Sequence, residues 1–338
     1  TASFGHGITT TLIQVVKAYS IIVNGGYNIK PSLLKNINPH FHDEYIFCNS
    51  GTEANMRAIR LARAYTQRDI IGRFHGGWHG GLDGCIEGDG VPSKTNSLFK
   101  ILPYNDDKCF DMLTKDMAAV IIEPSQGSNP RTDVGEFLHE LRKRCDELNI
   151  VLIFDEVMSG FRIAKGGGQE LFNIQPDLIT YGKVLGGGFP IGCLGGKSDI
   201  MKTDNVFFGG TFSANPLSMY SAKNILKCIE EETLIDYDHL QSIGDYFRRS
   251  LNEYFELYNI QKRAIGSGAI NRILHTDKFV RNRKDRDDFE DTNQDVFYEK
   301  LLEHGIFVNG NRIFHLSMCH SMKIIKTMVK VICEVCGE

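Results

Sequence analysis

The sequence predicts an α/β fold with a largely parallel sheet flanked by helices. Short apolar runs alternate along the chain with longer helical patterns, which is the order of parallel strands and their crossover helices. Polar side chains directly follow several of the apolar runs, as they do at the carboxyl edge of such sheets, where sites gather. The candidate strands are residues 45–48, 118–122, 151–154 and 178–181. The helical patterns are residues 53–65, 134–148 and 216–232.

The end of the chain predicts a second, smaller unit of α+β type. Strand candidates near 272–274 and within 305–316 follow the long helical stretch 216–258. The polar run 278–295 carries both signs of charge and predicts a solvated loop. We expect three segments: a foreign-looking stretch at 1–38, a large domain at 44–232 and a small C-terminal domain at 233–338.

Composition narrows the class of protein and its surroundings. The chain has 338 residues, 42% of them hydrophobic, and a net charge of -4, which suits a soluble enzyme and gives no reason to expect nucleic acid or an anionic membrane. The most apolar N-terminal stretch, Leu12 to Val23, contains Gln14 and Lys17 and is too short to span a membrane. Nine scattered cysteines suit a reducing compartment. We therefore predict a cytoplasmic protein with a small-molecule partner.

Two residues after candidate strands carry the strongest chemical signal. Lys183 stands among small residues and can reach an aldehyde, and Asp155 ends a buried run. Pyridoxal phosphate needs these two groups: an amine that forms a Schiff base, and an acid that keeps the ring nitrogen protonated so that the ring accepts electrons. Taken singly, each could be an ordinary turn or loop residue. Together they predict a pyridoxal-phosphate enzyme.

Two further runs fit the same cofactor. Ser50, Gly51 and Thr52 precede a helical pattern, so their backbone amides and hydroxyls would bind a phosphate. Trp78, the only tryptophan, stands among glycines that would let a flat ring approach and stack on it. The neighbouring His79 has a metal-like spacing to His75, but the glycines between them argue against a helix. We predict no metal there and a structural or cofactor-contacting histidine.

These motifs resemble those of class III, fold type I, pyridoxal-phosphate aminotransferases, and most of all the glutamate-1-semialdehyde aminomutase branch. The resemblance runs from about residue 44 to the end and is carried by residues 49–66, 121–127, 152–162, 176–196 and 209–219. It implies the Schiff-base role for Lys183, the pyridine-nitrogen role for Asp155 and phosphate contacts from Gly51 and Thr52. Thr211 would contact the phosphate of a second subunit, which implies a homodimer. The other expected cofactor contacts are Ser50, Trp78, His79, Glu123 and Val157.

The first residues resemble a different family. Residues 1–35 are similar to a non-catalytic stretch of penicillin-binding-protein transpeptidase domains. No Lys-Thr-Gly triplet occurs in the chain to complete a transpeptidase site, so we expect no such activity. The aminotransferase family carries a longer segment before the Ser50 motif, and a fused or shortened remnant without turnover is therefore one alternative.

The resemblance favours conversion of glutamate-1-semialdehyde to 5-aminolevulinate, with Lys183 carrying a proton between two carbons. Three positions depart from that branch: Gly81, Ser128 and Arg312. Arg312 could clamp a substrate carboxylate, as transaminases of acidic substrates require, or could be a solvated rim charge. The main alternative is thus a transaminase that passes an amino group from an amine or amino acid to a keto acid.

Overall fold

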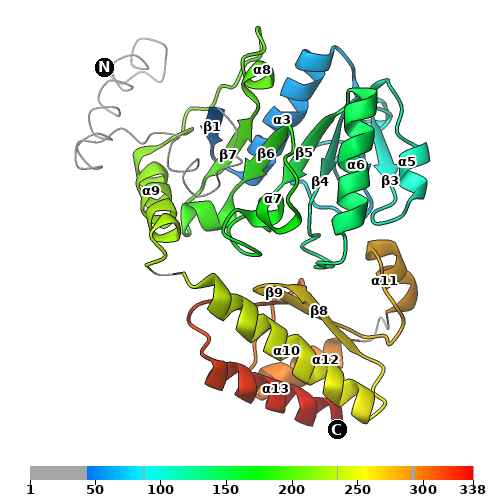
Figure 1. Ribbon diagram of the computed structural model, residues 1–338, viewed down its shortest axis with the longest axis vertical. Helices are drawn as coiled ribbons and strands as arrows, with labels where there is room; N and C mark the ends of the chain where they lie inside the picture. The colour runs from blue at the N-terminus through cyan, green and yellow to red at the C-terminus, as the bar shows by residue number, and fades with distance from the viewer. Residues whose placement is uncertain (1–43, 87, 234, 291–293, 338) are drawn as a thin grey trace.

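The computed structural model describes residues 44–86, 88–233, 235–290 and 294–337, and these form a large mixed sheet and a small one (Figure 1). The large sheet has seven strands in the order β1-β7-β6-β5-β4-β2-β3. The pairs among β2 to β6 are parallel, and only β7, between β1 and β6, is antiparallel to its neighbours. The strands are β1 (Glu44–Cys48), β2 (Ile70–Phe74), β3 (Phe99–Leu102), β4 (Met117–Ile122), β5 (Val151–Asp155), β6 (Leu178–Tyr181) and β7 (Gly192–Gly196).

Helices cover both faces of this sheet, with α3 and α6 on opposite sides (Figure 1). Strand β4 shows why its sequence is a continuous apolar run: Ala119 and Ile121 pack in the core below α3, whereas Val120 and Ile122 pack in the core below α6. The fold class expected from the sequence is therefore confirmed. The helices of this part are α3 (Gly51–Thr66), α4 (Ser93–Asn96), α5 (Lys108–Asp111), α6 (Gly135–Leu148), α7 (Gly167–Phe172), η1 (Lys183–Gly186), α8 (Ser198–Met201) and α9 (Pro216–Glu230).

The C-terminal part surrounds a second core. Its three antiparallel strands lie in the order β10-β9-β8, and α10 and α13 pack beside each other against them (Figure 1). Phe247 of α10 is fully buried in this core and contacts Phe314 of β10 at a ring separation of 5.3 Å. The elements are α10 (Tyr237–Leu257), β8 (Arg263–Ser267), β9 (Ile270–Leu274), α11 (Arg283–Phe289), α12 (Asp295–Glu303), β10 (Ile313–His315) and α13 (Met322–Gly337).

The prediction of a solvated loop over 278–295 was wrong, because this segment contains α11. Asn282 caps the helix by accepting from the Asp285 amide and also donates to the Tyr104 carbonyl. Arg286 is buried, donates to the Ser128 carbonyl at 2.7 Å and pairs with Glu290. Some charged residues of this segment thus point inward and are paired, while others point outward. Through these contacts, α11 docks the C-terminal part onto loops of the large sheet.

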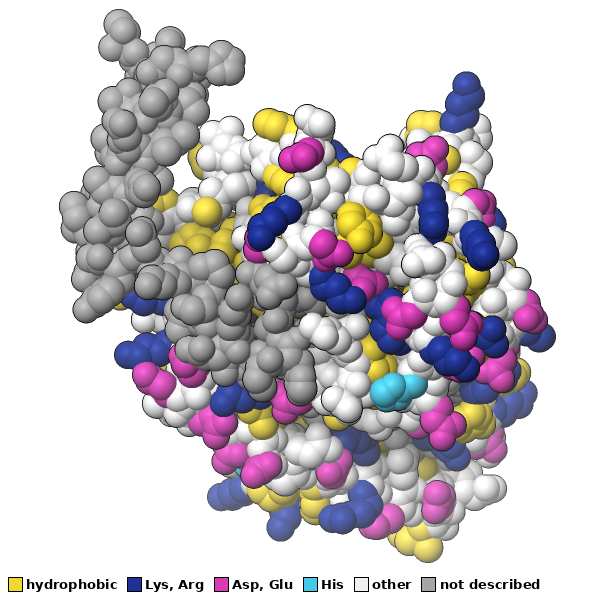
Figure 2. Space-filling view, turned by 45° about the horizontal axis from the view of Figure 1, so that its top comes forward, with side chains coloured by type: hydrophobic (Ala, Val, Ile, Leu, Met, Phe, Trp, Pro, Cys, Tyr) yellow, Lys and Arg dark blue, Asp and Glu magenta, His cyan; other side chains and the backbone are white. Residues whose placement is uncertain are grey.

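One face of the molecule is visible in space-filling form (Figure 2). Lysine and arginine side chains are interspersed with aspartate and glutamate there (Figure 2). Within the described residues, no helix is both long and apolar enough to cross a bilayer.

Two substitutions on α10 test the second core. Phe247→Ala is expected to lower the free energy of unfolding by about 3–5 kcal/mol, because it removes a fully buried ring. Leu257→Ala, on the same helix but 76% exposed, is expected to change it by no more than about 0.5 kcal/mol. Urea denaturation measures both. Equal losses would mean that α10 does not pack as described.

Candidate active site

Five chain segments meet at one edge of the large sheet. Asp155 ends β5, Lys183 follows β6, and Glu123 follows β4. The amino end of α3 follows β1, and His79 comes a few residues after β2. The carboxyl ends of parallel strands meet at the same sheet edge, so local sequence motifs far apart in the chain converge on one site.

The amino end of α3 presents two backbone amides, of Gly51 and Thr52, that have no backbone acceptor among the residues the structure describes. The Ser50 hydroxyl caps the helix by accepting from the Glu53 amide, and the Glu53 carboxylate accepts from the Asn49 amide at 2.7 Å. The first helical hydrogen bond runs from Ala54 to Ser50. The Gly51 and Thr52 amides precede that bond and point out of the helix end, which is the geometry that binds an anion.

Small residues let the other segments approach this helix end closely. A Cβ on Gly51 would lie 2.7 Å from a methyl carbon of Val157, and one on Gly182 would lie 3.7 Å from the Gly51 nitrogen. Gly80, with φ of +89°, packs on Thr52 so tightly that a Cβ would lie 2.2 Å from its hydroxyl. The helix end therefore lies directly beside the residue that precedes Lys183.

The Asp155 carboxylate is buried and is held by side chains from two other segments and by a backbone amide of the turn after β5. Asn55 of α3 and His79 donate to the same oxygen, Oδ2, at 2.7 and 2.8 Å. The Val157 amide donates to Oδ1 at 3.1 Å, and the Thr180 hydroxyl orients Asn55 by donating to its Oδ1 at 2.6 Å. A buried carboxylate needs such partners to stay ionised. His79 donates through Nδ1, and its Nε2 is buried without a partner among the described residues.

Glu123 is the second buried carboxyl group of the site. It accepts from the Trp78 amide at 3.0 Å and the Gly127 amide at 3.2 Å. Burial, and then the neighbouring charge of Asp155, raise its pKa to about 7. The Trp78 indole itself is 66% exposed, so a face of the ring is available to a ligand.

Lys183 begins the short helix η1 with a φ of 42°, a left-handed conformation that is uncommon for a residue with a side chain. Its Nζ lies 3.9 Å from the Met158 sulfur. Desolvation by neighbouring protein, and then the charge of Arg162, lower the pKa of the amine, while Glu123 and Asp155 act in the opposite direction. At a given pH, a larger fraction of this amine is therefore neutral and nucleophilic than in an ordinary lysine.

Glu156 follows Asp155 but faces a different environment. Its carboxyl group accepts from the Ser159 hydroxyl and from the Gln169 amide, and it is buried. Burial raises its pKa from 4.5 to about 7. We assign it a structural task, which is to hold the turn after β5 against the start of α7.

Two residues predicted from the sequence, Arg312 and Thr211, are not among the residues that make the contacts described above. The Arg312 guanidinium donates to Gln294 and Asp295 and lies over the Tyr298 ring, 5.3 Å from its centre. Thr211 is exposed, in a segment that is tied to α3 because Arg57 donates to the Gly209 carbonyl.

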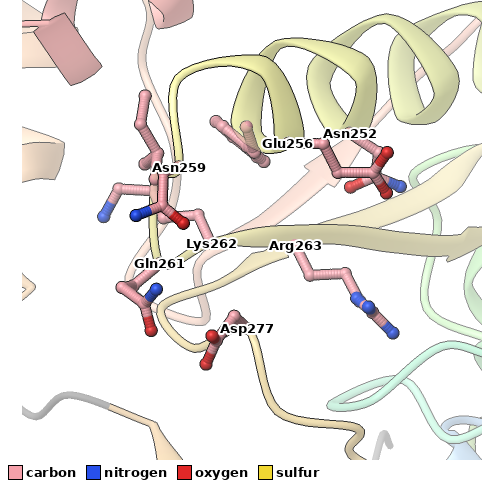
Figure 3. Close-up of a pocket in the computed structure, with 9 residues that line it drawn as sticks. Asn252, Glu256, Asn259, Gln261, Lys262, Arg263 and Asp277 are labelled. Atoms are coloured by element: carbon pink, nitrogen blue, oxygen red, sulfur yellow. The ribbon is translucent and has the colours of Figure 1, made fainter.

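Sequence reasoning missed Asn55 and Thr180. Neither had a clear signal, because α3 buries Arg57 as well as Asn55, and Thr180 looks like any strand residue. A separate cleft of about 240 Å³ lies beyond the end of α10, and it includes none of the predicted site residues (Figure 3). Lys262 and Asp277 are among its lining residues.

A lysine thus lies at the carboxyl edge of a parallel sheet near a buried, hydrogen-bonded carboxylate, in an α/β fold. A family model described as aminotransferase class III matches residues 11–334. The chain therefore belongs to the class III aminotransferase family.

Curated relatives are glutamate-1-semialdehyde 2,1-aminomutases. The one from Methanosphaera stadtmanae is 34% identical over 285 residues, 78% of this chain and 66% of the relative. The second such enzyme of Lachnoclostridium phytofermentans is 37% identical over 77% of this chain and 66% of its own length. The chain thus spans about two thirds of the length of these relatives.

Solved structures share the fold. An omega-transaminase from Sphaerobacter thermophilus aligns with a TM-score of 0.82 and 28% identity, over 94% of this chain and 78% of that one. A glutamate-1-semialdehyde-aminomutase from Pseudomonas aeruginosa in complex with PMP aligns with a TM-score of 0.78 and 18% identity, over 90% and 74% of the two chains.

The family match also bears on the start of the chain. It begins at residue 11, inside the stretch 1–38 that the sequence analysis set apart as foreign. Nothing in the comparisons supports the transpeptidase resemblance of residues 1–35, and those residues lie outside the part that the structure describes.

The raised pKa of Glu156 predicts a pH effect on stability. The folded state holds this proton more tightly than the unfolded chain, so stability falls as pH rises from about 4.5 to about 7 and is level above that. Glu156→Gln stays neutral. The fall in unfolding free energy between pH 5 and pH 8 should therefore shrink by about 2 kcal/mol in the variant.

Urea denaturation at the two pH values measures this difference. The control is Glu299→Gln, an exposed glutamate of α12, which should leave the pH dependence as in the wild type. An unchanged pH dependence in Glu156→Gln would show that Glu156 is ionised in the folded protein at pH 5.

Proposed function

We propose that this protein binds pyridoxal phosphate and converts glutamate-1-semialdehyde to 5-aminolevulinate. The observation that carries the proposal is the meeting of the Lys183 amine, the fixed Asp155 carboxylate and the open amino end of α3 at one sheet edge. The curated relatives that share about a third of its residues are aminomutases, and this supports the same substrate here.

The residues fit the cofactor's chemical groups. The Gly51 and Thr52 amides, with the Ser50 and Thr52 hydroxyls, would hold the phosphate. Asp155 would hold the ring nitrogen, with the unpartnered Nε2 of His79 as a further polar contact of the site. Lys183 would hold the aldehyde carbon. Trp78 and Val157 would contact the ring, and Glu123 would lie near its polar edge.

The cofactor, when bound, supplies an aldehyde that captures amines and a ring that accepts electrons. The protein's residues do the rest. The Asp155 carboxyl group is held at a fixed place because Asn55, His79 and the Val157 amide all donate to it. Lys183, with its lowered pKa, would take a proton from a substrate carbon and deliver it to the carbon of the bound cofactor's aldehyde group, and would carry it back in the reverse direction. Glu123, with a pKa of about 7, can donate or accept a hydrogen bond near neutral pH.

A transaminase that exchanges amino groups between two substrates is the second candidate. The structural match to an omega-transaminase with 28% identity favours it. So do the departures at Gly81, Ser128 and Arg312 from the aminomutase pattern. A remnant that folds and binds cofactor without turnover is the third.

Replacement of Lys183 tests the proposal. Wild-type protein mixed with pyridoxal phosphate is expected to show an absorbance band that borohydride removes, with the label on the peptide that contains Lys183. Lys183→Ala should lose this band and at least about 1,000-fold of the turnover, because the proton carrier is gone. Colorimetric detection of 5-aminolevulinate measures turnover.

The outcomes separate the three candidates. Formation of 5-aminolevulinate from glutamate-1-semialdehyde supports the aminomutase. Amino transfer to a keto acid without that product supports the transaminase, and a cofactor band without either reaction supports the remnant. A band that persists in Lys183→Ala would contradict the assignment of the lysine.

We also propose that the enzyme is a homodimer that uses the segment around Thr211. Large apolar side chains cluster there on the surface: Phe207 is 78%, Phe212 72% and Leu217 63% exposed. Buried Arg57 holds the segment by donating to the Gly209 carbonyl and the Ser213 hydroxyl. An exposed apolar cluster of this kind marks a protein interface.

Light scattering tests this arrangement. The wild type should have the mass of two chains, and Phe212→Glu combined with Leu217→Glu should give monomers, because charges would be buried at the interface. Leu257→Glu, at an equally exposed leucine of α10, should remain dimeric. A monomeric wild type would refute the proposal.

A cytoplasmic location is proposed as well. All nine cysteines are free, which supports a reducing compartment.

A further inference from the structure

Arg162 lies beside the reactive lysine and plays no part in the mechanism above. It follows β5 in the same turn as Met158, and its Nη1 lies 3.0 Å from the Met158 sulfur. The Lys183 Nζ lies 3.9 Å from that sulfur. Because both nitrogens contact one atom, their separation cannot exceed the sum of those two distances. The guanidinium and the amine are therefore close enough to contact two ends of one small molecule.

The Arg162 guanidinium lacks a strong acceptor. It has five N–H donors, and a thioether sulfur is only a weak acceptor. No carboxylate of the described residues forms an ion pair with it, in contrast to Arg272 and Arg286, which share Glu290. A partly buried guanidinium without an anion is costly, and one that stays so in the folded protein is suited to bind an anionic ligand.

The neighbourhood is basic on this side of the site. Desolvation, and then the charges of Arg162 and Lys183, lower the pKa of His315 to about 4, so this side chain of β10 is neutral at pH 7. The two carboxylates that act on Lys183, Glu123 and Asp155, have their own donors on the other side. A ligand that carries both an amine and a carboxylate would be oriented by this difference.

The backbone around Arg162 is fixed on both sides. Phe161, with a φ of 60°, stacks on Tyr181 at 5.0 Å, and its carbonyl accepts from the Tyr237 hydroxyl at 3.2 Å. Ile163 packs in a small core with residues of β9 and β10. The guanidinium thus extends from a rigid turn, so little conformational freedom would be lost when a ligand binds.

We propose that Arg162 binds the carboxylate of the amine substrate by charge-assisted hydrogen bonds. This inference rests on the proposed function, because the amine is taken to react with the cofactor aldehyde that Lys183 would hold. It assigns the carboxylate to Arg162 and leaves Arg312 as a bridge to α12.

The experiment compares two amines with the same carbon chain, 4-aminobutyrate and n-butylamine, on cofactor-loaded protein. Stopped-flow absorbance gives the second-order rate constant of the first half-reaction. Arg162→Gln should lower that constant about 10- to 100-fold for 4-aminobutyrate and change it less than about threefold for n-butylamine. Arg162→Lys should lose less, because it keeps the charge without the planar fork. Arg312→Gln is the matched control and should behave as the wild type.

A binding measurement keeps the test independent of turnover. Levulinate carries a carboxylate and no amine, and its affinity is measured by calorimetry with and without cofactor. Wild type and Arg312→Gln should bind it, and Arg162→Gln should bind at least about tenfold more weakly. Wild-type protein should also show a higher pKa of Lys183 when levulinate is bound, because the anion offsets the charge of Arg162.

The outcomes are decisive in either direction. Equal losses for both amines, or unchanged levulinate binding in Arg162→Gln, would overturn the proposal, and loss in Arg312→Gln alone would move the carboxylate to Arg312. If Lys183 takes up no cofactor, the proposed function fails, and levulinate binding to the cofactor-free protein still decides the role of Arg162.

Discussion

The buried carboxylate of Asp155 is the constraint on which the site depends. It cannot remain ionised in the interior without donors, and those donors come from α3, from the segment after β2 and from the turn after β5. Each donor fixes the position of a segment that has another task. Asn55 lies one turn into the helix whose first amides are open, and His79 lies next to Trp78. These hydrogen bonds therefore set the relative positions of the amino end of α3, the segment that carries Trp78 and the turn after β5.

The sequence predicted those candidate site residues that stand in short local motifs. Lys183 and Asp155 stand in short motifs at strand ends, and a parallel sheet brings such ends together whatever the intervening loops do. Asn55, Thr180 and Arg162 could not be assigned, because their roles depend on which atoms the fold brings within reach. The prediction of a solvated loop at 278–295 failed for another reason. The charged composition of this run predicts solvation, but Arg286 is buried and forms an ion pair with Glu290 at the end of a docked helix. Polarity alone does not separate a solvated loop from a helix with buried ion pairs.

The site is electrostatically divided. Asp155 and Glu123 have their own hydrogen-bond donors, while the charges of Arg162 and Lys183 act on His315 of β10 in the C-terminal part. Such a division favours one orientation of a ligand with separated charges and disfavours the reverse. The left-handed backbone of Lys183 adds a second restriction, because it fixes the direction from which the amine enters.

The docking of α11 limits how a substrate can enter. Arg286 donates to the Ser128 carbonyl and Asn282 to the Tyr104 carbonyl, so the C-terminal part is fastened to two loops of the large sheet. Swinging it away as a rigid lid would expose a buried arginine and leave both carbonyls unpaired, at a cost of about 1–3 kcal/mol for each broken contact. The cheaper route is a small displacement of exposed side chains such as Trp78. A ligand could then enter with local side-chain motion, which is fast, and without hinge opening of a whole domain.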